Sequence, residues 1–165
     1  MLVVAGCSGL GIWYRARLQD GIIQLQRLKQ LLELLMSEIR YHNATLPESC
    51  RLAGKRMPRP WGEALLQIWE KLEKDMGRGF GESWREEIGL HLEDLPISER
   101  EKEVVLGVAE CEGFCDAAMQ LRALEQHRDL LEDTIKRRKE QLQEQGRMAV
   151  GLGILGGLLL VIVFL

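Results

Sequence analysis

The two ends of this chain lack charged residues. Every Lys, Arg, Asp and Glu lies between Arg15 and Arg147. Residues 148–165 also lack proline and amide side chains. As an α-helix this segment reaches roughly 27 Å, close to the hydrocarbon thickness of a bilayer. A helix that is apolar on every side does not suit the surface of a soluble domain. The sequence therefore predicts a C-terminal transmembrane helix over residues 148–165, anchored in a lipid bilayer.

Residues 1–14 are also uncharged, but they reach only about 21 Å as a helix. Trp13 and Tyr14 suit the aromatic belt of a membrane, and Arg15 and Arg17 can extend toward the interface. This pattern favours an N-terminal membrane helix. Two alternatives remain open: a lipid anchor at Cys7, and a helix lying in the interface. A cleaved signal peptide is disfavoured because no basic region precedes the apolar stretch.

Basic residues flank both apolar segments on the side of the central region. Arg15 and Arg17 follow the first segment, whereas residues 136–139 (Lys-Arg-Arg-Lys) and Arg147 precede the second. Positive charge favours the cytoplasmic side of a membrane. We therefore expect residues 15–147 to form one cytoplasmic domain between the two anchors.

The chain lacks the patterns that mark common active and binding sites. The three histidines belong to no recognised nucleophile motif, and the glycine-rich residues 77–81 are not followed by Lys-Ser/Thr. Cys111 and Cys115 share a helical face, but no second pair completes a metal site, so they are interpreted as small core residues. A net charge of −3 without a basic stripe indicates no nucleic-acid partner. We predict no catalytic residue, no cofactor and no metal.

The central region also lacks the strict alternation of apolar and polar residues that marks strands, and helical spacing dominates. The first apolar stripe predicts a helix that continues from the membrane to about Tyr41. Its members are Leu18, Ile22, Leu25, Leu28, Leu32, Leu35, Ile39 and His42.

Punctuating residues divide the remainder into further helices. Thr45 and Glu48 form a capping pattern that starts a short helix ending near Lys55. Apolar stripes then predict helices from Trp61 to Met76 and from Phe80 to Leu95, the second ended by Pro96. A second capping pattern is Ser98 to Glu101, which opens a helix continuing through Val108 to about Gly113. Asp116 caps a last long helix that reaches Gly146 and leads into the terminal segment. The fold class is therefore all-α, with about six helices in the cytoplasmic bundle.

Two surface features accompany this pattern. Along the last helix, Glu132 and Glu140 stand four residues on either side of Lys136, as expected for a solvated face. Gly153 and Gly157 form a small surface on which another membrane helix can pack closely, for example residues 1–14. A homo-oligomer is compatible with the sequence.

Three stretches resemble the stage III sporulation protein AB family of endospore-forming bacteria. The first runs from Leu35 through Glu38 and Tyr41 to Thr45–Glu48, with Leu46-Pro47 in the reverse of the family's order. The second is Gly113 to Asp116, with Gln120. The third is the glycine- and leucine-rich tail, residues 151–162.

This resemblance implies an assembly component and not an enzyme. The family belongs to a channel between mother cell and forespore, and its soluble bundle is similar to cytoplasmic domains of the platform protein in type II secretion and type IV pilus machines. The implied location is the mother-cell membrane facing the forespore. The implied partners are the stage III sporulation AA ATPase and other stage III A-series membrane proteins. Glu38, Tyr41, Asp116 and Gln120 match motif positions, where they either contact a partner or stabilise helix junctions.

Two alternatives remain from the sequence alone. The first is a membrane-tethered helical scaffold or signalling protein unrelated to secretion. The second is a membrane enzyme that uses His42, Asp116 or His127.

Overall fold

The computed structural model describes the backbone of residues 2–74, 77–113 and 116–164, and the side chains of residues 16–74, 77–111 and 116–144. Within these ranges the chain forms six α-helices and one 3-10 helix, with no strand. The all-α prediction is confirmed.

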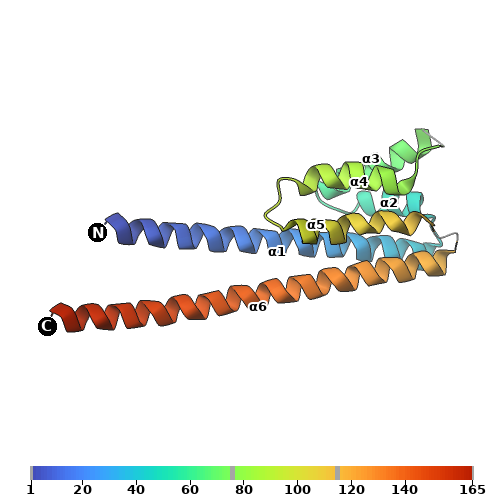
Figure 1. Ribbon diagram of the computed structural model, residues 1–165. Helices are drawn as coiled ribbons and strands as arrows, with labels where there is room; N and C mark the ends of the chain where they lie inside the picture. The colour runs from blue at the N-terminus through green and yellow to red at the C-terminus, as the bar shows by residue number, and fades with distance from the viewer. Residues whose placement is uncertain (1, 75–76, 114–115, 165) are drawn as a thin grey trace.

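Two long helices organise the molecule (Figure 1). Helix α1 (Leu2–His42) and helix α6 (Ala117–Phe164) run side by side in opposite directions, so both termini lie at one end. The shorter elements pack around the other half of this hairpin. They are α2 (Leu46–Gly54), α3 (Trp61–Lys74), α4 (Phe80–Leu92), α5 (Glu99–Leu106) and the 3-10 helix η1 (Gly107–Gly113).

The core contains the apolar stripe that the sequence predicts for the first helix. Leu18 is half-buried and the other leucines and isoleucines of the stripe are buried, whereas His42 is exposed. They pack against buried side chains of the short helices and of α6, which include Trp61, Ile68, Trp84, Ile88, Leu124 and Leu131. Trp84 also donates its indole N–H to the carbonyl of Val105 at 3.0 Å, which ties α4 to α5.

Capping residues start the helices where the sequence predicts. Thr45 is the N-cap of α2 and accepts a hydrogen bond from Glu48 N at 3.5 Å. The Glu48 carboxylate does not close the expected box but pairs with Arg51 on the next turn. At α5, Ser98 and Glu101 form the predicted capping box, with Glu101 accepting from Ser98 N at 2.6 Å.

Two helices end earlier than the sequence analysis predicts. Helix α4 stops at Leu92 and not at Leu95. The Leu95 N–H donates a hydrogen bond to the Leu92 carbonyl, which closes a turn just ahead of Pro96. Helix α5 stops at Leu106 and not near Gly113, and η1 covers the difference. There the Val105 carbonyl accepts from the Trp84 indole, and the backbone N–H of Gly107 turns to the carbonyls of Glu103 and Val105 as the α-helix ends. Met76, expected in the third helix, lies outside the described residues.

The predicted membrane segments, 1–14 and 148–165, lie outside the residues whose side chains the structure describes, as do Gly153 and Gly157. In the described part of the chain, no helix combines the length and apolar character needed to cross a bilayer. The backbones of α1 and α6 are helical across the predicted domain boundaries at residues 15 and 147.

Candidate interaction site

The four motif residues gather at the end of the hairpin opposite the termini. Glu38 and Tyr41 lie in the last turns of α1, and Asp116 and Gln120 lie at the start of α6 (Figure 1). We call this end the distal tip and define it as Tyr41 to Ala44 together with Asp116 to Gln120. The fold thus brings together two motifs that are about half the chain apart in sequence.

Glu38 is a buried carboxylate that joins α1 to the end of α2. Its side chain is 1% exposed, and Oε1 accepts a hydrogen bond from Arg56 Nη1 at 2.6 Å. Oε2 lies 2.9 Å from His42 Nδ1 but lacks the geometry of a hydrogen bond with it. Because a buried charge is costly unless it is paired, Arg56 anchors the segment after α2 to this position.

Tyr41 has a different environment from Glu38. Tyr41 is 74% exposed, and Met119, in the first turn of α6, is 53% exposed. Between them the chain leaves α1 at Asn43, which adopts a left-handed conformation with φ of 48°. Tyrosine and methionine are both enriched at protein interfaces, and here both are exposed.

Asp116 and Gln120 lie at the first turn of α6. Asp116 Oδ1 accepts from Ala118 N at 3.3 Å, and its carbonyl accepts from Gln120 N at 3.0 Å, so Asp116 acts as the predicted cap. Gln120 is half-buried and makes polar contacts of its own. These two side chains therefore support the tip, while Tyr41 projects from it.

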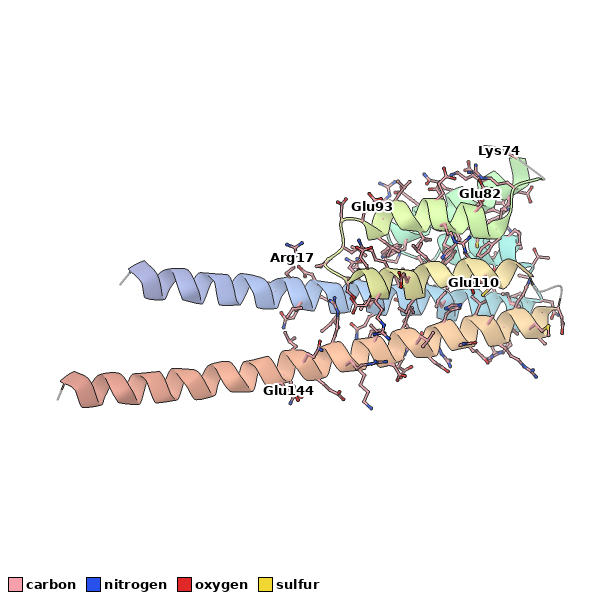
Figure 2. All side chains as sticks on the ribbon, in the orientation of Figure 1. Arg17, Lys74, Glu82, Glu93, Glu110 and Glu144 are labelled. Atoms are coloured by element: carbon pink, nitrogen blue, oxygen red, sulfur yellow. The ribbon has the colours of Figure 1, made fainter. Side chains whose placement is uncertain are left out.

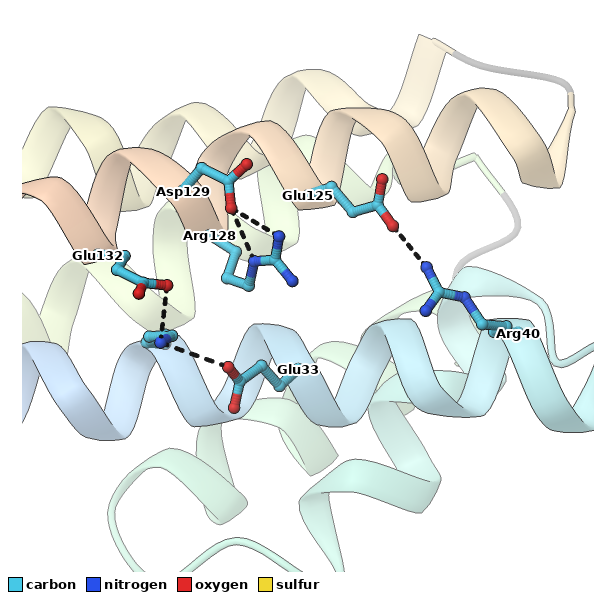
Figure 3. Close-up of polar contacts among 7 residues, drawn as sticks. Glu33, Arg40, Glu125, Arg128, Asp129 and Glu132 are labelled. Carbon is cyan, nitrogen blue, oxygen red and sulfur yellow. Dashed lines mark hydrogen bonds and ion pairs between the residues drawn. The ribbon is translucent and has the colours of Figure 1, made fainter.

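Ion pairs join α1 to α6 below the tip (Figure 3). Arg40 contacts Glu125 at 2.5 Å, and Lys29 contacts Glu132 at 2.9 Å. The hydrogen bond to Glu132 raises the pKa of Lys29, outweighing the opposite effect of partial burial. Glu132 thus reaches across to α1, a contact that the spacing along α6 alone does not predict.

A second polar cluster, which the sequence does not predict, is the clamp formed by Gly21, Pro96, Glu101 and Arg138. The Arg138 guanidinium contacts Glu101 through Nε at 2.5 Å and Nη2 at 2.6 Å, and it donates from Nη1 to the Pro96 carbonyl at 3.0 Å. Gly21 makes room for it, since an added Cβ would lie 2.2 Å from Arg138 Nη1. A glycine inside the predicted first helix was the available signal, because glycine weakens a helix unless packing requires it.

The residues considered for chemistry are dispersed or buried. Cys111 is buried, and burial raises the pKa of its thiol to about 11. Burial lowers the pKa of His127, with Glu110 acting in the opposite direction, and its Nδ1 is buried without a hydrogen-bond partner. His91 packs edge-on against Trp61. Among the described residues, no group of three or more Cys, His, Asp or Glu is placed to hold a metal ion; Cys115 lies outside them.

Two comparisons with known proteins lead to the same family name. The family model for stage III sporulation protein AB matches residues 1–165. A solved structure titled stage III sporulation protein AB has a similar fold, with a TM-score of 0.65 and 18% identity, covering 75% of this chain and 97% of that one. A search of curated proteins found no match. The family match extends over the whole chain, so this protein belongs to the stage III sporulation protein AB family.

Proposed function

We propose that this protein is a membrane-anchored assembly component of the channel between mother cell and forespore, and that it holds the AA ATPase of stage III sporulation at its distal tip. The observation that carries the proposal is that the two ends of the hairpin differ. Both uncharged terminal segments lie at one end, and the motif residues lie at the other (Figure 1). A platform needs this separation between the part held in the membrane and the part that meets a cytoplasmic partner.

The tip offers a suitable docking surface for such a partner. Tyr41 and Met119 present apolar surface, while the buried Glu38–Arg56 pair and the Asp116 cap fix the backbone beneath them. A surface held in shape before binding loses less conformational entropy when the partner docks. The other stage III A-series membrane proteins are proposed to meet the membrane-embedded segments, where Gly153 and Gly157 supply a packing surface.

The test is co-purification of the AA ATPase with the full chain from membranes of sporulating cells. The tip variant is Tyr41→Ala/Met119→Ala, and the matched control is Ile23→Ala, another exposed apolar side chain on α1. We expect the wild type and the control to retain the ATPase and the tip variant to lose most of it. Equal recovery with all three would exclude the tip, and no association in membranes would overturn the coupling.

A topology map tests the orientation separately. Reporters fused at residue 1 and near residue 75 should place the second reporter in the cytoplasm, in keeping with the basic flanks of both apolar segments. A reporter near residue 75 found outside the cytoplasm would overturn both the orientation and the ATPase contact.

A further inference from the structure

Two shallow hollows flank α5, and they differ in charge. The acidic hollow lies between α4 and α5 and has a volume of about 430 Å³. It contains four glutamates against one arginine and one lysine, a formal charge of −2, and of these glutamates Glu86 already pairs with Lys71 and Arg78 outside the hollow. Its charged residues are Arg85, Glu86, Glu93, Glu99, Lys102 and Glu103.

The basic hollow lies on the other side of α5, against α6, and has a volume of about 370 Å³. It contains three arginines against one glutamate, a formal charge of +2. Arg138 is already held by Glu101 within the clamp. Arg100 and Arg137 have no ion-pair partner in the described part of the chain, so two cations remain for an acidic surface.

An exposed leucine stands beside each set of charges. Leu90 lines the acidic hollow and is 60% exposed, and Leu130 lines the basic hollow and is 40% exposed. Gly89 leaves open space in the acidic hollow, because an added Cβ would meet only Leu106 at 3.9 Å. The basic hollow has apolar surface at Val104. Each hollow therefore pairs a projecting leucine with room for another one.

The two hollows lie at the same level along the hairpin. Both are lined by α5, whose eight residues span about 12 Å. Glu99, Lys102, Glu103 and Leu106 line the acidic side, and Arg100, Glu101 and Val104 line the basic side. Figure 1 shows α4, α5 and α6 running roughly parallel, and Figure 2 places Glu93 at the end of α4 nearer the two termini. Copies held in one bilayer by the same terminal segments would thus present these surfaces at equal height.

We propose that the acidic hollow of one copy docks on the basic hollow of a second copy of this chain. Leu90 of one copy enters the basic hollow beside Val104, and Leu130 of the other enters the space over Gly89. Glu93 and Glu103 face Arg100 and Arg137 across the contact. In the symmetric alternative two identical hollows would meet, and like charges would then face each other across the contact. This repulsion disfavours the symmetric arrangement.

In the head-to-tail arrangement the contact joins two different surfaces and leaves one of each free on every pair. Repetition gives a ring if the rotation between copies closes, and an open row if it does not. The inference rests on the membrane attachment in the proposed function, because the anchors set the common height. It does not depend on the AA ATPase.

Cross-linking of the full chain in membranes tests the geometry. Differently tagged copies carrying Leu90→Cys or Leu130→Cys are co-expressed in a Cys7→Ser/Cys115→Ser background, with Cys50 and Cys111 left in place because they are buried. A short bismaleimide should join the two kinds of copy. Cross-links between two Leu90→Cys copies, or two Leu130→Cys copies, should be weak. Predominant cross-linking of identical positions would overturn the head-to-tail arrangement.

Charge reversal tests the pairing of the surfaces. Glu93→Arg/Glu103→Arg and Arg100→Glu/Arg137→Glu should each weaken self-association by about tenfold or more. Mixing these two variants should restore the contact, because each then presents the charge that the other lacks. The control Glu70→Arg/Glu73→Arg reverses two exposed charges on α3, outside both hollows, and should leave association unchanged.

Filling the acidic hollow provides a variant that does not disturb the fold. Gly89→Met adds a side chain where the structure has space, so the helix should persist while the mixed cross-link is lost. Retention of that cross-link in Gly89→Met and in both charge-reversal pairs would overturn the inference. Loss of membrane association in the wild type, seen by fractionation, would instead count against the proposed function.

Discussion

Replacement of Gly21 by alanine tests the clamp most directly. An added Cβ would lie 2.2 Å from Arg138 Nη1 and 2.6 Å from the Pro96 carbonyl oxygen. The first contact involves the end of a flexible side chain, but the second involves backbone. Since Nη1 donates to that same carbonyl at 3.0 Å, the alanine must displace the guanidinium, the α4–α5 connection or both.

Two opposing effects set the magnitude. Alanine stabilises a helix by about 1 kcal/mol relative to glycine. A hydrogen bond from a charged group contributes about 1.5–3 kcal/mol, and disruption of a buried ion pair costs about 3–5 kcal/mol. The Arg138 and Glu101 side chains are only 14% and 10% exposed, so solvent screens this pair little. We expect a net loss of roughly 0.5–2 kcal/mol if only the Pro96 contact breaks, and more if the Glu101 pair breaks too.

Thermal unfolding of the full chain in detergent, followed by circular dichroism, measures this effect. For a chain of this size, a loss of 1 kcal/mol lowers Tm by about 2–4 °C. The matched control is Gly89→Ala. There the added Cβ meets only Leu106 at 3.9 Å, so the only expected effect is the stabilisation from alanine's higher helix propensity. The effects of Gly21→Ala and Arg138→Ala should also be less than additive, because both remove the same contact. If Gly21→Ala raises Tm as Gly89→Ala does, the clamp does not stabilise the fold.

Three further outcomes can be measured. Burial raises the pKa of the Glu101 carboxyl, but hydrogen bonds from Arg138 and Ser98 outweigh this and hold the pKa below its ordinary value. The stabilisation by the Glu101 carboxylate should therefore be complete above pH 4.5 and should decline as pH falls through the folded-state pKa. A Glu101→Gln variant with an unchanged acid transition would contradict this. Trp84→Phe removes the 3.0 Å hydrogen bond to the Val105 carbonyl, so it should cost about 1–3 kcal/mol in denaturant unfolding, and a neutral result would show that another donor replaces the indole. Burial raises the pKa of the Cys50 thiol well above its ordinary value, so Cys50 should resist iodoacetamide until the chain unfolds, as read by mass spectrometry; rapid labelling of the folded protein would show local opening.

Local signals in the sequence account for most of the helix boundaries. The capping residues Thr45, Ser98 and Asp116 precede α2, α5 and α6 as predicted, because caps act on the nearest backbone N–H groups. The early end of α4 follows a local turn ahead of Pro96, whereas α5 ends where Val105 accepts a hydrogen bond from another helix. The Trp84 indole reaches Val105 from another helix, and no periodicity within residues 99–113 contains that information.

The candidate site shows the same division. The motif residues could be picked out by resemblance, but their separate environments could not. Glu38 is buried because Arg56 comes back to it from beyond α2, whereas Tyr41, three residues later, projects into solvent. The clamp was missed because its members are separated by up to 117 positions, from Gly21 to Arg138, and only the folded chain brings them together.

The positions of the polar contacts bear on how the proposed membrane anchor and the proposed docking tip would act together. Arg40–Glu125 joins α1 to α6 near the tip, Lys29–Glu132 joins them farther along, and the clamp adds the α4–α5 connection nearer the termini. Helix α6 continues from Ala117 to Phe164, so the tip and the terminal segment share one hydrogen-bonded backbone. A partner that moves the tip must therefore either move the whole hairpin or break these contacts. Under the proposed function, these contacts suit a rigid platform better than a flexible tether. Loss of the clamp, more than loss of the exposed ion pairs, should then loosen the short helices from α1 and α6.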